Sequence, residues 1–522
     1  MRKIAIIYTL LISLFAVSCK DFNELEKDPN RPVSVPASLA FNGALVDLYD
    51  GAWNDVMRWN QFYASNYNYY ANNEYGWTST GLNYTTLKNV IKMEEEVKKS
   101  GAKELNPYSA IGKFLRAYYF VKMTARVGDI PVDDALKGLE NIKPKYNTQK
   151  EVYVKSLQLL EDANTDLTQL ISAGDITLSG DIYLNNSLRA WQKVVNTFKL
   201  RVLISLSKKE ADAELSIKQK FSDVINNPAK YPVITSNSEN MSYVYNTQFN
   251  KYPRNRDNYG FNALRENMAA TYIDPLVDLK DPRIFIVAEP TIAKIKSGAL
   301  PSDFASFAGA KSDEDLSDMS TKAQLGLYSF QNRKRYYDGY TAETTIQVGY
   351  PELCFNIAEA FNRGWVSGKS AIDAEDQYKK GILASMDFYG ISTGNLTSTY
   401  LKDGDGLGTY QSYTVAVDLV AYYNQVKVKY AGNTQAGLDQ ILTQKYLAFF
   451  MNSGWEAFYN QRRTGIPFFY KDGPGNGNSA RIPKRWQYPT AENQYNTANY
   501  QSAIQAQFGG KDDINMDLWI VK

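Results

Sequence analysis

Carboxylates are the side chains of this sequence most suited to acid–base chemistry, because its 522 residues include no histidine. The absence of imidazole excludes Ser-His-Asp and Cys-His catalysis and HExxH zinc sites. Acidic residues occur in adjacent runs such as Asp133-Asp134 and Asp313-Glu314-Asp315. A glycosidase instead needs two carboxyl groups about 5–10 Å apart, one on each side of the scissile bond. We interpret the runs as solvated faces and predict no catalytic residue, no cofactor and no enzyme activity.

A possible calcium loop begins at Asp403. An EF-hand loop starting there needs glycine at its sixth position, which Gly408 supplies, and a carboxylate at its twelfth, where the chain has Thr414. The mismatch favours a flexible surface turn, so we predict no metal site. Whether a calcium ion binds near Asp403 and Asp405 stays open at this point.

Aromatic side chains are the second chemical resource, with 39 Tyr, 23 Phe and 8 Trp. Between residues 66 and 84 they alternate with asparagine and glycine and follow neither a helix nor a strand period. Because sugars present CH faces for stacking and hydroxyls for hydrogen bonds, such a loop suits a glycan. The candidate ligand-binding residues of this loop are Trp77, Tyr75, Tyr70, Tyr69, Asn72 and Asn73. Trp77 offers the largest ring; the alternative is that these rings pack the loop against helices.

A second candidate site lies in a long insertion between residues 328 and 340. Its candidate ligand-binding residues are Tyr328, Arg335, Tyr336 and Tyr337. An arginine beside stacked rings can hydrogen-bond sugar hydroxyls, although a helix-capping role is equally simple.

The N-terminus has the pattern of a bacterial lipoprotein signal. Residues 1–18 combine a basic start with a 14-residue apolar run, which is too short to span a bilayer, and end at Cys19. Cys19 is therefore the predicted lipidation site, and residues 19–36 form a predicted lipid-anchored tether. The net charge of +2 gives no basic face for nucleic acid.

The elements that must position these residues are predicted to be mainly helices. Apolar stripes indicate helices over residues 45–63, 107–128, 153–170, 191–202, 353–360, 378–389 and 438–458. Thr148 and Glu151 form a capping box that begins one of them. Short strands are expected at residues 241–245 and 284–287. We predict a single body over residues 37–522, with loop insertions near 66–84, 297–345 and 472–479.

Six motifs in order resemble one family. Gly454-Trp455-Glu456-Ala457-Phe458, followed by Arg462-Arg463-Thr464-Gly465-Ile466-Pro467, resembles the late motif of SusD/RagB-like outer-membrane lipoproteins. The branch is the SusD-like group two, associated with starch binding. The earlier and later matches are Arg116–Tyr119 with Gly128–Pro131, Trp191 with Asn196–Arg201, Ala358–Ala360 with Arg363–Trp365, and the segment from Arg481 to Tyr500.

The resemblance implies a fold and a partner. It implies an all-α body of tetratricopeptide-like helix pairs with an irregular, loop-rich ligand-binding subdomain. It also implies a cell-surface lipoprotein of the outer membrane that captures glycans or peptides and covers a SusC-like TonB-dependent transporter. In this chain, Glu456–Arg463 and Trp455–Arg462 are seven residues apart, so we interpret them as an ion pair and an aromatic stack within one helix.

Three functions follow from these expectations. The first is a non-catalytic surface lipoprotein that binds an oligosaccharide, or a peptide as in the RagB type, and delivers it to the transporter. The second is a surface glycosidase acting through Asp and Glu only. The third is a structural lid without a ligand of its own. A substrate-turnover assay separates the first two, and a glycan-array screen tests the third.

Overall fold

The computed structural model describes residues 34–69 and 71–522, except for the side chains of residues 261 and 262. The signal peptide, Cys19, most of the tether and Tyr70 lie outside the described residues. Helices dominate what is described, and the strands form only two-stranded sheets. None of the described helices combines the length and the apolarity needed to cross a membrane.

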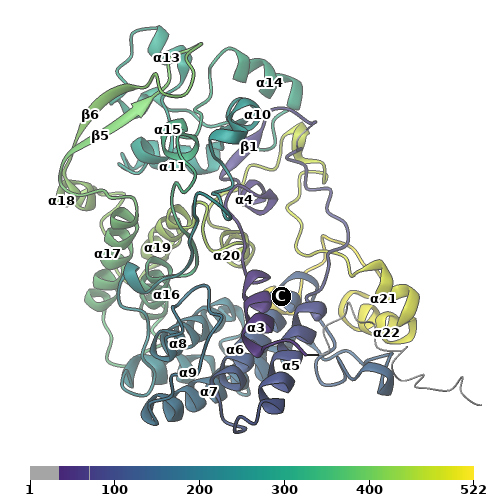
Figure 1. Cartoon of the computed structure of the whole chain (residues 1–522). Coiled ribbons are helices and arrows are strands. Elements are labelled where there is room, and N and C mark those ends of the chain that lie inside the picture. The colour runs from purple at the N-terminus through teal and green to yellow at the C-terminus, as the bar shows by residue number, and fades with distance from the viewer. Residues whose placement is uncertain (1–33, 70) are drawn as a thin grey trace, which may run out of the picture.

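An array of antiparallel helices forms the lower half of the molecule in Figure 1. Its members are α3 (Ala37–Val46), α5 (Tyr84–Lys99), α6 (Pro107–Val127), α7 (Gln149–Ser172), α8 (Leu188–Ser205) and α9 (Ile217–Asn226). Local sequence fixes where two of them begin. Thr148 accepts a hydrogen bond from the Glu151 amide while Glu151 accepts one from the Thr148 amide, which confirms the predicted capping box. Pro107 occupies the first turn of α6, where it removes no helical hydrogen bond.

A second group of helices continues this array. It consists of α16 (Tyr350–Asn362), α17 (Ala371–Phe388), α19 (Gln435–Ala448) and α20 (Glu456–Thr464). α16 packs against α17, α19 and α8, so it joins the two groups. The all-α helix-pair architecture predicted from the sequence is therefore confirmed.

The upper, loop-rich end is built from short elements (Figure 1). These are α4 (Asp55–Trp59), α10 (Tyr259–Arg265), α11 (Ala270–Asp278), α12 (Ile284–Val287), α13 (Ile292–Lys296), α14 (Leu316–Gln324), α15 (Arg333–Tyr337) and α18 (Leu419–Asn424). Strands β1 (Tyr63–Ser65) and β3 (Glu266–Met268) pair antiparallel, as do β2 (Met241–Tyr243) with β4 (Thr345–Val348) and β5 (Gly394–Tyr400) with β6 (Gln411–Val417). The predicted loop at 297–345 thus contains two short helices.

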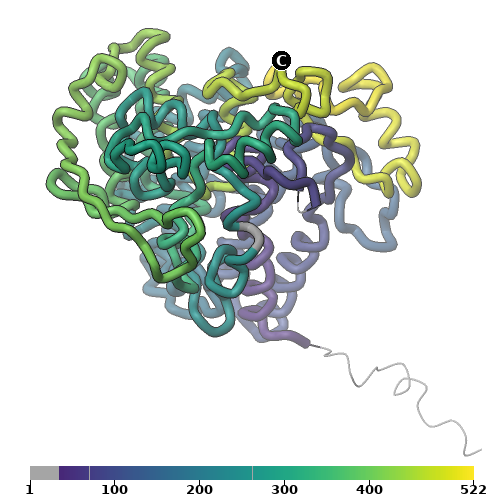
Figure 2. The backbone as a smooth tube through the Cα atoms, turned by 90° about the horizontal axis from the view of Figure 1, so that it is seen from above, coloured from purple at the N-terminus to yellow at the C-terminus, as the bar shows by residue number. Residues whose placement is uncertain are grey.

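The C-terminal part of the chain lies at the opposite edge from the β5–β6 hairpin, as the view from above shows (Figure 2). It includes α21 (Thr490–Tyr495) and α22 (Thr497–Phe508). Short 3₁₀ turns complete the structure at Gly138–Glu140, Ser207–Lys209, Asn237–Glu239, Arg256–Asn258, Phe304–Ser306, Pro474–Asn476 and Trp519–Val521.

Two long helices expected from the sequence are broken. The predicted helix over 45–63 is wrong: α3 ends at Val46, Trp53 has a left-handed φ of 59°, and Asn54 caps the separate α4. The predicted helix over 438–458 divides into α19 and α20, because Met451 and Gly454 have φ values of 58° and 54°. A reversed φ ends a helix whatever the apolar spacing on either side.

The strand predictions had mixed outcomes. Residues 241–243 form β2 as expected. The strand expected at 284–287 is instead the single helical turn α12. The Asp281 side chain accepts a hydrogen bond from the Arg283 amide, and the Ile284 amide bonds to the Asp281 carbonyl. This side-chain capping of the preceding turn directs the apolar run into a helix.

Candidate functional site

Most of the aromatic loop at 66–84 is folded inward. Tyr75 is 2% exposed and Trp77 is 6% exposed. The Trp77 ring stacks on Trp486 with centroids 4.0 Å apart and an interplanar angle of 12°, and it also contacts Trp455 and Phe458. The expectation that Tyr75 and Trp77 present exposed faces is therefore wrong. Rings from a distant part of the sequence contact Trp77, whereas the Tyr75 side chain contacts Trp59, Gln61 and Trp77.

Two polar residues of the same loop have structural hydrogen bonds. The Asn73 side chain accepts from the Ser65 amide at 2.9 Å and donates to the Ser65 carbonyl at 2.8 Å, as a strand neighbour would. The Tyr75 hydroxyl donates to the Trp59 carbonyl and accepts from Gln61. Burial raises the pKa of Tyr75 well above its usual value. These contacts fix the path of the loop.

The second predicted cluster, at 328–340, is also mostly internal. Tyr336 and Tyr337 are both 0% exposed, so no ring face is available to a ligand in this conformation. Arg335 pairs with Glu343 at 2.8 Å, and Tyr328 donates a hydrogen bond to Glu314. The open ring faces that ligand binding needs are absent for these two tyrosines in this structure. Tyr336 packs against Trp53 and Tyr252, which come from two distant segments, and Tyr337 packs against Tyr259 of α10.

One groove at the loop-rich end has the size of a ligand pocket. This upper groove provides about 470 Å³ for water-sized molecules, within the roughly 300–1,000 Å³ typical of small-molecule sites. Its lining comes from distant segments: Asn66, Tyr259, Leu264, Arg265, Ile292, Ser320, Ala323, Gln324, Phe330, Arg333 and residues 402–405. Amide, guanidinium, hydroxyl and carboxylate groups thus line one groove beside apolar surface.

Two tyrosines of the predicted loop follow Asn66, which lines this groove, although neither ring is part of the lining. Tyr69 is 79% exposed and Tyr67 is 40% exposed, with ring centroids 6.5 Å apart. The Arg265 guanidinium lies 4.5 Å from the Tyr67 ring centroid, which connects the rings to the groove. The antiparallel β1–β3 pair sets this geometry, because it continues into a hydrogen bond from the Asn66 amide to the Arg265 carbonyl.

Residues 72–79 of the same loop contribute to the lining of a smaller pocket, which we call the tryptophan pocket. It offers about 210 Å³ and is lined by Trp59, Asn72, Glu74, Gly76, Trp77, Thr78, Ser79 and Trp486. Asn72 is exposed at its rim. Trp77 therefore borders a pocket although its ring is buried.

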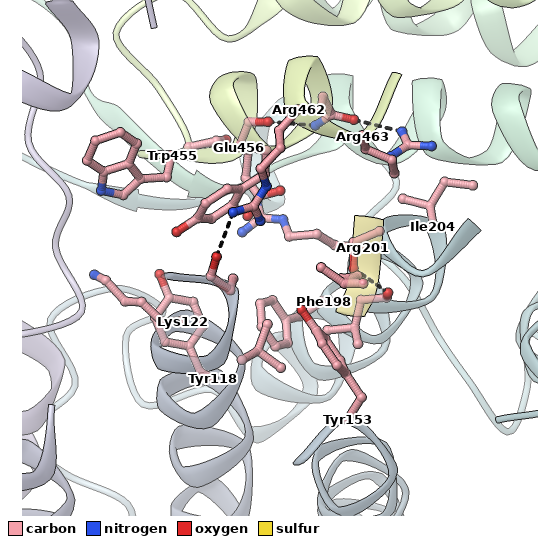
Figure 3. A pocket seen from close by; sticks show the side chains of 18 of the residues that line it. Tyr118, Lys122, Tyr153, Phe198, Arg201, Ile204, Trp455, Glu456, Arg462 and Arg463 are labelled. Atoms are coloured by element: carbon pink, nitrogen blue, oxygen red, sulfur yellow. Dashed lines mark hydrogen bonds between the residues drawn. The ribbon is translucent and has the colours of Figure 1, made fainter. Parts of the chain in front are cut away.

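A third hollow lies in the interior (Figure 3). It leaves only about 60 Å³ for the centres of water-sized molecules, which is too little for a sugar ring. Tyr118, Lys122, Tyr153 and Arg201 reach it from α6, α7 and α8, and α20 covers it from the other side (Figure 3). We call it the interior cavity.

The Arg462-Arg463 motif borders the interior cavity, with partners other than those expected. Arg463 pairs with Glu359 at 2.9 Å rather than with Glu456. Arg462 donates to two backbone carbonyls and lies 4.8 Å from the Tyr459 ring centroid rather than on Trp455. The motif thus joins α20 to α16 and to α6. A spacing of seven residues could not show these partners from other helices.

Residues 402–405 do not form a cation cage in the part of the chain that the structure describes. Asp403 pairs with Lys296. Within residues 34–69 and 71–522 no group of three or more His, Cys, Asp or Glu side chains is placed to hold a metal ion. Asp405 instead contributes to the lining of the upper groove.

Comparisons with known proteins agree on one family. Residues 29–489 match the SusD-like family described as "Starch-binding associating with outer membrane". A SusD homologue from Bacteroides fragilis is 30% identical, with a TM-score of 0.80 over 94% of this chain and 100% of that one. An outer-membrane protein from Bacteroides vulgatus, described as involved in nutrient binding, is 29% identical, with a TM-score of 0.77 over the same shares.

A chitin-binding SusD homologue from Flavobacterium johnsoniae shares the fold at 20% identity, with a TM-score of 0.68 over 93% of this chain and 98% of that one. No curated protein matches the sequence.

Proposed function

This chain belongs to the SusD-like family associated with the outer membrane, and we propose that it is a non-catalytic surface lipoprotein that captures an oligosaccharide. In this proposal Cys19 carries the lipid anchor, and a SusC-like TonB-dependent transporter receives the glycan. The family's starch-binding description supports a glycan over a peptide.

The observation that carries the proposal is the upper groove with Tyr67 and Tyr69 beside it. An exposed tyrosine ring can stack on the CH face of a sugar, which the buried Trp77 cannot do. Gln324 and Asp405 offer amide and carboxylate groups to ring hydroxyls, and Arg265 adds donors close to the Tyr67 ring. The arrangement binds and orients a polyol, and it contains no histidine for acid–base catalysis.

The test is a binding screen of the purified chain from residue 20 onwards on a glycan and peptide array, followed by calorimetry with the best glycan. Tyr69→Ala and Tyr67→Ala should each weaken binding by about tenfold or more, since loss of an aromatic anchor costs about 2 kcal/mol. Tyr495→Ala is the matched control, because Tyr495 is 74% exposed on α21 and away from the groove lining.

Three other results would redirect the proposal. Peptide binding without glycan binding would favour the RagB-type alternative. Release of reducing ends from a bound glycan would indicate an Asp/Glu glycosidase. Wild-type affinity in both tyrosine variants would move the site to the tryptophan pocket, where Asn72 and Glu74 are the residues to replace next.

A further inference from the structure

The interior cavity lies where the N-terminal helix array meets α19 and α20 (Figure 3). The interior cavity is too small for a sugar ring but large enough for several water molecules. A buried water needs about 10–15 Å³ of space for its centre, so about 60 Å³ accommodates about four waters. Its lining is strongly charged, and buried charges require partners. Pairing each charge with its partner shows which ones remain.

Three of the lining cations have a carboxylate of their own. Lys122 on α6 bonds to Asp50 at 3.0 Å. Arg201 on α8 bonds to Glu352 on α16 at 2.7 Å. Arg463 on α20 pairs with Glu359, also on α16, as described above.

Arg462 lacks a carboxylate partner among the described residues. It is held by the carbonyl oxygens of Ala125 and Lys484 at 2.9 and 2.7 Å. It lies over Tyr459, and the tyrosines of α6 and α7 that also line the cavity are Tyr118 and Tyr153.

Among the described residues, Glu456 and Lys445, like Arg462, have no oppositely charged partner within ion-pair distance, and unlike Arg462 neither is held by backbone carbonyls. Within the described ranges the Glu456 carboxylate accepts no hydrogen bond, and no cation lies within the 4.0 Å of an ion pair. Lys445 is 1% exposed and uses one donor, to the Asn460 side chain at 2.9 Å, although an ammonium group has three. Glu456 lies deep in the protein yet keeps some accessible surface, and it is part of the cavity lining.

We propose that a cluster of about four waters occupies the interior cavity and bridges Glu456 to Lys445 as a solvent-separated ion pair. Waters of this kind bond to two to four polar groups each, and the unused donors of Lys445 and the unpartnered oxygens of Glu456 supply them. The pair links the first turn of α20 to the last turn of α19.

The pair has a predictable dependence on pH. Burial raises the pKa of Glu456, and Glu352 adds to the effect, while Arg201, Lys445 and Arg463 oppose it. Burial also lowers the pKa of Lys445 to about 8, with Glu359 acting in the opposite direction. A raised folded-state pKa gives Glu456 a stabilising contribution that is complete below its unfolded pKa, about 4.3, and is lost as pH rises through the folded value.

A double-mutant cycle tests the bridge. Glu456→Gln should stabilise the protein at pH 7, because it removes a buried charge. In the Lys445→Met background Glu456 has lost its counter-charge. There, Glu456→Gln should stabilise the protein more than it does in the wild-type background, by a further factor of about ten in the folding equilibrium constant, since coupled sites interact at roughly this level. Equal effects in the two backgrounds would refute the interaction. The control is Glu104→Gln, whose side chain is 96% exposed and whose effect should be the same in both backgrounds.

A high-resolution crystal structure of the wild-type protein tests the water itself and does not depend on any variant folding. We expect ordered waters between the Glu456 carboxylate and Lys445 Nζ. An empty cavity, or a direct contact between the two groups, would overturn the proposal.

Discussion

Trp77→Ala distinguishes a packing role from a binding role for the most prominent residue of the aromatic loop. Trp77 is only 6% exposed, and its ring contacts Trp59, Tyr75, Trp455, Phe458 and Trp486. Truncation of a buried tryptophan to alanine costs about 3–5 kcal/mol. Loss of the parallel stack on Trp486 adds to this by about 0.5–1.5 kcal/mol. The structure therefore predicts a large stability defect.

The expected shift in melting temperature follows from the size of the chain. An unfolding entropy of about 2.1 cal/mol/K per residue gives about 1.1 kcal/mol/K for 522 residues. A loss of about 4 kcal/mol then lowers the midpoint by about 4 °C. This is measurable by differential scanning fluorimetry, with a urea titration as the second assay.

Ligand binding by the Trp77→Ala variant is the decisive comparison. At a temperature where the variant is still folded, affinity for the best array glycan should change far less than it does in Tyr69→Ala. A variant that melts with the wild type but loses binding would show that Trp77 is a ligand contact and that our account of its burial is wrong. Tyr495→Ala again serves as the control for an exposed aromatic ring.

Two further predictions concern charge and anchoring. Burial alone would raise the pKa of Glu359, but Arg463 and Arg363 outweigh burial and hold the pKa at about 2. The stabilising contribution of Glu359 should therefore be complete above its unfolded pKa of about 4.3 and should be lost as the pH falls towards 2. Glu359→Gln should flatten this acid limb in a urea titration series and cost about 3–5 kcal/mol at pH 7 because it leaves Arg463 buried and unpaired, whereas an unchanged acid limb would contradict the pairing. Cys19→Ser should abolish metabolic palmitate labelling, and the wild-type protein should co-purify with a TonB-dependent transporter in mild detergent; equal labelling of the variant, or a wild-type protein that purifies as a free monomer, would count against the anchored-lid proposal.

Local signals were sufficient to predict the helix array. The capping box at Thr148–Glu151 and the stripes of α6 and α7 depend on residues within one or two turns of each other, and the structure has those helices. The breaks at Trp53, Met451 and Gly454 were not predictable from apolar spacing. A residue with a positive φ ends the helix, although the apolar spacing in the sequence continues on both sides of it.

The candidate site was only partly predictable for a different reason. The expectation for the aromatic loop treated its rings as one set, whereas Tyr69 is exposed and Trp77 is stacked on Trp486. Nothing near Trp77 in the sequence indicates that partner. Asn66, Arg265 and Asp405 meet in the upper groove from three distant segments, so no linear spacing could have grouped them.

Contacts between residues 60–61 and residues 454–470 have a consequence for how the chain folds. Asn60 bonds to the Gly454 carbonyl, 394 residues away, and to the Phe458 amide, while Gln61 bonds to Tyr470. At about 5–20 residues per second, ribosomes take about 20–80 s to make that intervening length. Throughout that interval Trp59 and Trp77 lack the rings of residues 455–486 that contact them in the folded chain. This early segment therefore demands protection from aggregation, and contacts of such high sequence separation predict slow final folding.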